Sequence, residues 1–293
     1  MKTPDPSFRY PIKKGAYHRP GIERQGAWIS FTVAVPAEKD CALLLYKKGK
    51  KEAEIEIPME HSTRYGDLRS VEIENLPIEK YEYNYRIAGA IVTDPYARRI
   101  AGRETWGQAS AGEGALRGCI ISDDFDWEGD EPLQIPYTDV IAYATHVRGF
   151  TRHPTSGVRA KGTFAGVQEK IPYLKELGIN QLELMPVYEF AEVEAWDEKR
   201  PPIRRGGKAD EPLMNYWGYA DSYYFAPKAS YASSKDPVRE LKTLVKELHK
   251  NGIELVLEFY FPKGIQTARV LDCIRYWVLN YHIDGVHVNR DHT

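Results

Sequence analysis

The sequence has too few cysteines for a disulfide framework or a zinc site. Cys41, Cys119 and Cys273 are odd in number and far apart, which excludes both patterns. The first ten residues are polar and contain proline, without the apolar segment of a secretion signal. No apolar run approaches the length of a transmembrane helix. We therefore expect a cytoplasmic protein that has no metal site and needs no cofactor.

A strong charge of either sign is also missing. The formal net charge is −2 over 293 residues, so nothing favours nucleic acid or an anionic membrane as a partner. Aromatic residues are plentiful instead, with 20 tyrosines and 6 tryptophans. Such residues fill cores and interfaces. They also suit a sugar-binding protein, because the faces of pyranose rings stack on aromatic rings. Composition leaves both alternatives open.

Residues 1 to about 130 have the pattern of an all-β domain. Alternating or apolar segments bounded by turn residues cover residues 28–35, 41–46, 54–57, 70–73 and 81–87. Tyr81, Tyr83 and Tyr85 fall on one face of the last segment. Short strands separated by turns predict a β-sandwich.

The pattern changes at about residue 135. Apolar runs predict strands at residues 140–150, 179–187, 253–261 and 286–289. Helical periodicity predicts helices over residues 163–177, over residues 270–281 and after Asp236-Pro237. Strands that alternate with helices indicate a parallel sheet. Four strands make about half of an eight-stranded barrel, or a small open sheet. Half a barrel leaves unpaired edges, so we expect a longer natural polypeptide or another chain that covers the edge.

Several motifs of this second region resemble those of a known enzyme family. They are Tyr143-Ala144-Thr145-His146, Leu184-Met185-Pro186-Val187-Tyr188-Glu189-Phe190, Asn215-Tyr216-Trp217-Gly218-Tyr219 and Tyr281-His282-Ile283-Asp284-Gly285. In these motifs the chain resembles glycoside hydrolase family 13, in its isoamylase, pullulanase and glycogen-debranching branch. The β-rich half, with Asp94-Pro95-Tyr96-Ala97, resembles the family 48 starch-binding module. The resemblance implies a carbohydrate-binding-like β-sandwich at residues 1–130, followed at residues 135–293 by the first half of a TIM (β/α)8 barrel.

The resemblance also implies a retaining mechanism on α-glucosidic bonds. One carboxylate attacks the anomeric carbon and a second protonates the leaving oxygen. The nucleophile of the family is an aspartate on the fourth strand, two residues after an arginine. Asn289 and His287 occupy these two positions here. An amide has no anionic oxygen with which to attack, and a histidine is a poor substitute for a bidentate arginine.

The third strand departs from the family pattern as well. Glu258 stands where the family has an aspartate, and Pro262 and Lys263 stand where it has asparagine and histidine. The general acid of the family lies on a later strand, beyond Thr293. Tyr219 matches the tyrosine that stacks on the sugar at the cleavage site, although it can equally be a core-edge residue that packs on Trp217.

We therefore expect an α-glucan-associated protein, meeting glycogen or starch, that does not hydrolyse its ligand. Tyr219, Trp217 and Glu258 are the expected substrate-binding residues. One alternative is an active hydrolase or transglycosylase, completed by residues beyond this chain or by Glu258 or Asp291 as a replacement nucleophile. Another is a structural or assembly fragment.

Other polar residues near these motifs are expected to have structural roles. His146 should make hydrogen bonds inside the barrel, and Glu189 should anchor a loop. The basic run Arg204-Arg205-Gly206-Gly207-Lys208 is expected to be a solvated loop.

Overall fold

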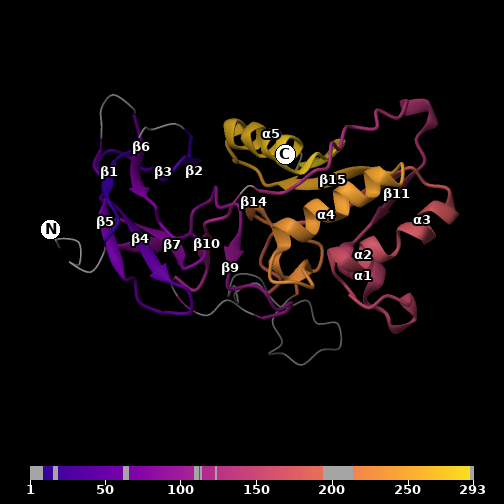
Figure 1. The fold of residues 1–293 in the computed structure, drawn as a ribbon, viewed down its shortest axis with the longest axis horizontal. Coiled ribbons are helices and arrows are strands. Elements are labelled where there is room, and N and C mark those ends of the chain that lie inside the picture. Colours follow the sequence, from indigo (N-terminus) through magenta and orange to yellow (C-terminus); the bar gives the residue numbers. More distant parts are fainter. Residues whose placement is uncertain are drawn as a thin grey trace. The chain divides into compact units, whose positions relative to one another are not determined.

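In the computed structural model the chain forms two compact units (Figure 1). The first comprises Met1–Gly102 and Ser110–Asp123, and the second comprises Arg103–Ala109 and Asp124–Thr293. The structure describes all residues except 1–8, 16–18, 62–65, 109–111, 113, 123, 194–213 and 291–293, and all side chains of these described residues except that of Arg290.

The boundary between the units differs from the sequence-based division near residue 130. Residues 124–130 belong to the second unit. Within it, Trp127 stacks on His282 with ring centroids 3.8 Å apart, and the Asp130 carboxylate lies 2.8 Å from His249. These contacts attach the segment to the helices and strands that follow.

The first unit contains two antiparallel sheets, as the short predicted strands indicate. One has the strand order β1-β6-β3-β2, formed by β1 (Ile12–Lys14), β2 (Gly21–Gln25), β3 (Trp28–Ala34) and β6 (Leu68–Glu74). The other has the order β5-β4-β7-β10-β9, with β8 paired to β7. Its strands are β4 (Cys41–Lys47), β5 (Ile55–Pro58), β7 (Tyr81–Ile87), β8 (Ala90–Val92), β9 (Ile100–Ala101) and β10 (Arg117–Cys119).

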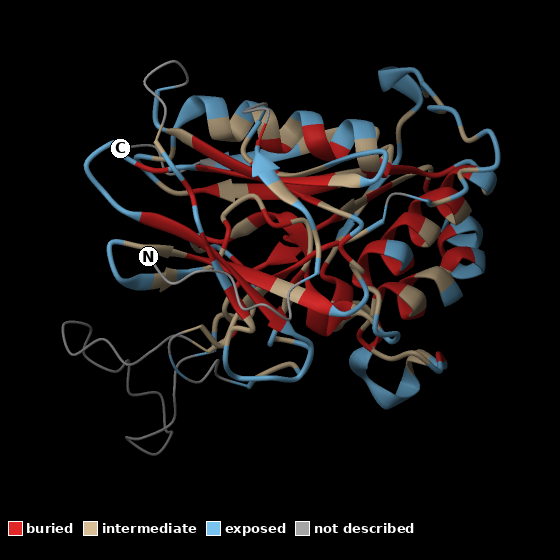
Figure 2. Cartoon of the chain, turned by 60° about the vertical axis from the view of Figure 1, so that its left-hand side comes forward, coloured by how far each residue is buried: buried red, intermediate tan, exposed pale blue. Residues whose placement is uncertain are grey.

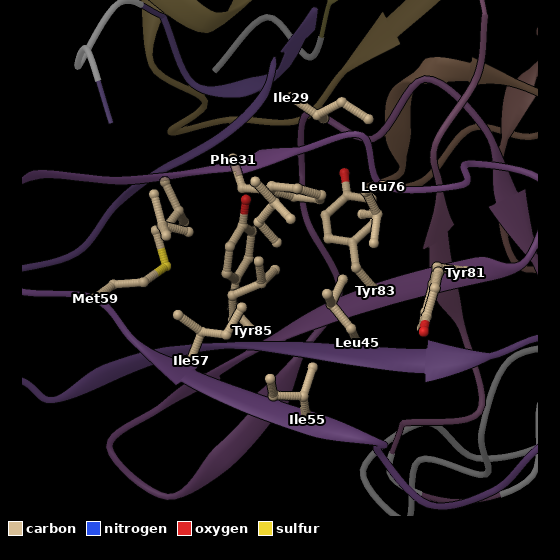
Figure 3. Packing of buried hydrophobic residues seen from close by; sticks show 14 of the residues in the cluster. Ile29, Phe31, Leu45, Ile55, Ile57, Met59, Leu76, Tyr81, Tyr83 and Tyr85 are labelled. Atoms are coloured by element: carbon tan, nitrogen blue, oxygen red, sulfur yellow. The ribbon is translucent and has the colours of Figure 1, made fainter. Parts of the chain in front are cut away.

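Side chains from both sheets form the core of this unit. Ile29 and Phe31 of β3 lie in one cluster with Leu45 of β4 and with Tyr83 and Tyr85 of β7 (Figure 3). Phe31 meets Tyr83 edge-on with ring centroids 5.4 Å apart. The prediction that the tyrosines of β7 share one face is confirmed, since Tyr83 and Tyr85 are fully buried there. The unit is therefore a β-sandwich.

The second unit is built on a parallel sheet of four strands in the order β11-β12-β15-β16. The strands are β11 (Ala142–Thr145), β12 (Gln181–Leu184), β15 (Glu254–Phe261) and β16 (Gly285–Arg290). A separate antiparallel pair is formed by β13 (Tyr188–Glu189) and β14 (Tyr223–Pro227). The order follows the chain, as the first four strands of a β/α barrel would.

Helices connect the strands of this sheet. They are α1 (Val147–Arg152), α2 (Phe164–Glu169), α3 (Ile171–Leu177), α4 (Pro237–Lys250) and α5 (Thr267–Tyr281), with short 3-10 helices at Tyr137–Asp139, Pro154–Ser156 and Ala229–Tyr231. The predicted start of α4 is confirmed, because the Asp236 side chain accepts the Arg239 N–H. In Figure 1, α4 and α5 run alongside β15.

Three predicted elements were too long. The strand predicted at residues 140–150 ends at Thr145, because the His146 side chain caps α1 by accepting the Gly149 N–H. The strand predicted at residues 179–187 ends at Leu184, shortly before Pro186, which has no N–H for a sheet. The helix predicted over residues 163–177 is divided at Lys170, because Pro172 fits only the first turn of a new helix.

The strands of the second unit separate an apolar face from a polar one. Leu255, Leu257 and Phe259 of β15 are fully buried, and Phe259 contacts Trp277 of α5 at 5.9 Å between centroids. Alternate residues of the strand, including Glu254 and Glu258, point to the opposite face. In Figure 2 the strands are largely coloured as buried, whereas exposed residues lie on the outer sides of the helices.

Candidate functional site

Polar side chains gather on the inner face of the sheet, near the carboxyl ends of β15 and β16. Glu258 lies opposite His287 in the strand register, and Tyr260 lies opposite Asn289. In β/α folds this end of the sheet is where ligands bind. The parallel pairing thus brings together Glu258, His287 and Asn289, three of the residues selected from the sequence.

The Glu258 carboxylate is the centre of this group. Its Oε1 accepts hydrogen bonds from the Tyr219 hydroxyl at 2.9 Å and from Asn289 Nδ2 at 3.3 Å. The Glu258 residue is only 5% exposed. Partial burial and the Glu258 carboxylate raise the pKa of Tyr219 to about 12, so the tyrosine stays a neutral donor. The carboxylate is therefore held from two sides by groups that donate hydrogen.

A tight turn places Tyr219 and Trp217. Gly218 has φ +83°, and a Cβ there would lie 2.7 Å from the Phe190 ring and 2.9 Å from Pro186. The Asn215 side chain accepts the Gly218 N–H at 3.0 Å, and the Tyr188 hydroxyl donates to the Gly218 carbonyl at 3.2 Å. Only glycine satisfies both the backbone angle and the space, so the Trp-Gly-Tyr sequence fixes the direction of both aromatic rings.

Trp217 and Tyr219 are exposed on either side of this glycine, by 49% and 38%. Tyr219 lies beside Tyr260 with centroids 5.8 Å apart, whereas Trp217 packs edge-on against Tyr216 and His146. The two rings have separate neighbours, which differs from the alternative in which Tyr219 packs on Trp217. Two exposed aromatic surfaces next to a hydrogen-bonded carboxylate are suited to binding a sugar.

His287 contacts a carboxylate that the sequence analysis did not select. Its Nδ1 lies 2.6 Å from Glu183 Oε1 on β12, and this hydrogen bond raises the pKa of His287. Alternation in the segment Gln181-Leu182-Glu183-Leu184 could have placed Glu183 on the polar face. Tyr188 was missed as well: its hydroxyl accepts the Tyr260 N–H at 3.1 Å and so joins the turn to β15.

Two other polar residues have the structural roles expected for them. His146 is 5% exposed and lies 2.9 Å from the Tyr216 carbonyl, and burial lowers its pKa to about 4. Glu189 is fully buried and accepts hydrogen bonds from the Lys228 ammonium at 2.9 Å and the Ala229 N–H at 2.8 Å. Asp291 and the Arg204-to-Lys208 run lie outside the described residues.

The described part of the chain contains neither a metal-binding cluster nor a membrane-spanning helix. No group of three or more His, Cys, Asp or Glu side chains there is arranged to hold a metal ion. None of the described helices combines the length and apolar character that crossing a membrane requires.

Comparison with known proteins identifies relatives of the chain. Residues 127–262 match the family described as alpha amylase, catalytic domain. The chain is 33% identical over 259 residues to isoamylase 1, chloroplastic, of Arabidopsis thaliana, covering 70% of this chain and 32% of that protein. It is 28% identical over 348 aligned positions to the glycogen debranching enzyme of Erwinia tasmaniensis, covering 94% of this chain and 50% of that protein.

The fold is similar to that of a pullulanase from Paenibacillus barengoltzii, solved in complex with maltohexaose and alpha-cyclodextrin. The TM-score is 0.72 at 23% sequence identity, with 92% of this chain and 48% of that chain covered. The chain thus spans between 32% and 50% of the length of these three proteins. Residues 127–262 thus match the alpha amylase catalytic domain, and the chain is similar to isoamylases and glycogen debranching enzymes over part of their length.

Proposed function

We propose that the chain binds α-glucan at the carboxyl end of the β15–β16 sheet and does not cleave it through the aspartate mechanism of the family. One observation carries this proposal. Asn289, at the position where the resemblance places the nucleophilic aspartate, is an amide that donates to the Glu258 carboxylate, which also accepts from the Tyr219 hydroxyl.

The chemistry of residue 289 argues against nucleophilic attack. Retaining hydrolysis needs two carboxyl groups about 5–5.5 Å apart, one of which forms a bond to the anomeric carbon. Asn289 supplies an amide, whose Nδ2 donates to Glu258. This side chain has no anionic oxygen to attack with or to stabilise a positively charged transition state.

Glu258 is poorly placed to replace the missing nucleophile. Its Oε1 already accepts two hydrogen bonds and the residue is 5% exposed. Attack requires a carboxylate oxygen about 3–3.5 Å from the anomeric carbon and aligned with it. The carboxylate is better suited to orient the Tyr219 hydroxyl, which leaves the Tyr219 ring as a surface for stacking on a sugar.

The names of the relatives support α-glucan as the ligand class. Relatives include glycogen debranching enzymes, and the similar pullulanase was solved with maltohexaose. Trp217 and Tyr219 provide two exposed aromatic faces, which a chain of glucose units can contact at successive rings.

Affinity electrophoresis in native gels that contain glycogen tests the binding. Wild-type protein should be retarded by glycogen, and Tyr219→Ala should lose most of the retardation. Tyr137→Ala is the matched control, because Tyr137 is 94% exposed on the same unit and away from the turn. Absence of retardation in the wild type, or equal loss in both variants, would contradict the proposal.

Release of reducing ends from glycogen tests the absence of cleavage. We expect no release above a buffer control. Turnover that disappears in Glu258→Gln would contradict this part of the proposal and would show that cleavage depends on the Glu258 carboxylate.

A second candidate function, as an assembly piece, is supported by the edges of the parallel sheet. In the described part of the chain β11 and β16 each pair on one side only, and Val288 of β16 is 43% exposed. Unpaired strand edges bind other strands. Size-exclusion chromatography with light scattering tests it, since a strictly monomeric chain would exclude self-assembly through these edges.

A further inference from the structure

A contact across the sheet joins two strands that are not neighbours. Glu183 of β12 and His287 of β16 lie on either side of β15, yet their side chains approach to 2.6 Å. The register places Glu183 opposite Val256, and Val256 opposite Gly285. Because Gly285 has no side chain, the inner face is open at this point. A Cβ there would lie 3.2 Å from Val256.

His287 therefore faces two carboxylates. Glu183 of β12 binds its Nδ1, and Glu258 of β15 lies opposite it in the register. Its own strand adds the uncharged amide of Asn289, and no other charged group among the described residues acts on it. Two negative charges favour the imidazolium form of the ring.

The other nitrogen of the ring is open. The His287 side chain is 54% exposed, and Nε2 has no hydrogen-bond partner among the described side chains and backbone. With Nδ1–H donated to Glu183, the ionisation of the ring decides what Nε2 offers. In the imidazolium it is a hydrogen-bond donor, and in the neutral ring it is an acceptor.

We propose that charged His287, held by Glu183, donates a hydrogen bond from Nε2 to a glucan hydroxyl, so that α-glucan binding weakens when the ring loses its proton. This inference rests on the proposed function, because it concerns the ligand of the same site. Glu183 is a positioning residue: it orients the imidazole and stabilises its charge without touching the sugar.

The direction of the pH effect follows from the carboxylates. The hydrogen bond to Glu183 and the charges of Glu183 and Glu258 raise the pKa of His287 above its ordinary 6.5. The charged donor is present below that raised value and is lost as the pH rises through it. A charged hydrogen bond exceeds a neutral one by about 1–1.5 kcal/mol, which corresponds to about five- to tenfold in affinity.

Binding of maltohexaose, followed by tryptophan fluorescence or calorimetry between pH 5.5 and 9, tests the inference. The wild-type dissociation constant should rise about five- to tenfold over this range. His287→Gln should bind with little pH dependence. Glu183→Gln should retain the dependence with its midpoint shifted to lower pH, a change that loss of a merely structural contact would not produce. His153→Gln removes another exposed histidine of this unit and should behave as the wild type.

The outcomes separate this inference from the proposed function. If wild-type protein binds maltohexaose equally at both ends of the range, the inference is wrong and glucan binding stands. If dependence of the same size persists in His287→Gln, another group causes it and the inference is again wrong. If the wild type binds maltohexaose at no pH while circular dichroism shows that it is folded, the proposed function is wrong, and the inference that rests on it is wrong as well.

Discussion

Each end of the parallel sheet contains a histidine imidazole beside two carboxylates, but one imidazole is buried and the other is exposed. At the amino end, His249 of α4 lies between Asp130 and Asp284, 2.8 and 2.9 Å away. At the carboxyl end, His287 lies near Glu183 and Glu258. The His249 side chain is 2% exposed and the His287 side chain 54% exposed. One histidine has both nitrogens occupied by the protein, and the other has one nitrogen left for a ligand.

This difference shows that the burial of a histidine with two carboxylates decides whether it stabilises the fold or can bind a ligand. Both nitrogens of His249 face carboxylate oxygens, an arrangement that favours the charged ring, which donates from both nitrogens. Asp284 also accepts the Leu255 N–H, and Asp130 also binds His282. Such a buried and connected network fixes the segment around residue 130 to α4 and to the start of β16. The open pair at the other end is available for chemistry, in agreement with the general division of β/α sheets into a stabilising and a functional end.

Removing the buried histidine should have the largest effect. His249→Leu leaves the Asp284 side chain buried without its cation and leaves Asp130 with His282 alone, which costs about 3–5 kcal/mol. Urea unfolding followed by tryptophan fluorescence measures it, since Trp127 stacks on His282 in this network. His153→Leu is the control at an exposed histidine; it loses the hydrogen bond that the His153 side chain accepts from the Thr155 N–H and should cost about 1 kcal/mol. Equal midpoints for His249→Leu and the wild type would show that the buried histidine at the amino end does not stabilise the fold.

The turn that supports the carboxyl end should be the next most sensitive position. Gly218→Ala adds a Cβ 2.7 Å from the Phe190 ring at φ +83°, so we expect a loss of about 2–4 kcal/mol and weaker glucan binding. Gly178 has the same φ of +83° with nothing within 4 Å of a Cβ. Gly178→Ala should therefore cost only the backbone strain, about 1–2 kcal/mol. A similar cost for both variants in urea unfolding would show that Phe190 moves aside.

Alkaline pH should weaken the amino end. Burial by itself lowers the pKa of His249, but the hydrogen bonds and charges of Asp284 and Asp130 outweigh it and leave the pKa raised. The stabilisation is therefore complete below the ordinary value of 6.5 and is lost as the pH rises through the raised value. The free energy of unfolding should fall between pH 6 and pH 9.

His249→Gln supplies the control for this pH effect. Its stability should fall less over the same range, because the group that titrates is absent. Lys246 and Lys250 of α4 and His282 lie around the same network and are unchanged in the variant. If the wild type and His249→Gln lose the same free energy on going to pH 9, His249 is not the group responsible.

Local sequence pattern was enough to predict the sheet but not its polar networks. The apolar run over residues 253–261 predicted β15, and Asp236-Pro237 predicted the start of α4. The pairs Glu183–His287 and Asp130–His249 join residues 104 and 119 positions apart. The hydrophobic periodicity of the sequence cannot predict such contacts, because they depend on which strands lie side by side and on the space above Gly285.

The candidate site shows the same limit. The resemblance of the Asn215-to-Tyr219 motif selected Trp217 and Tyr219, which the structure places on either side of the Gly218 turn, and the parallel register brought Glu258 and Asn289 together. The sequence could not show that Tyr219 packs beside Tyr260 instead of Trp217. The end of β11 was misplaced because a histidine caps the following helix, whereas Ser, Thr, Asp and Asn are the usual capping residues.

A substitution of Asn289, at the exposed carboxyl end of the sheet, should have the smallest effect on stability. Asn289→Asp replaces the donor 3.3 Å from Glu258 Oε1 with a second carboxylate. Two carboxylates at this distance repel each other unless one of them holds a proton. Because residue 289 is exposed, water screens the repulsion, and we expect a loss of only about 1 kcal/mol at pH 8, smaller at pH 5. Asn289→Ala loses the hydrogen bond without adding charge, so its stability should differ little between the two pH values. If Asn289→Asp is as stable as the wild type at pH 8 in urea unfolding, the amide does not hold the Glu258 carboxylate.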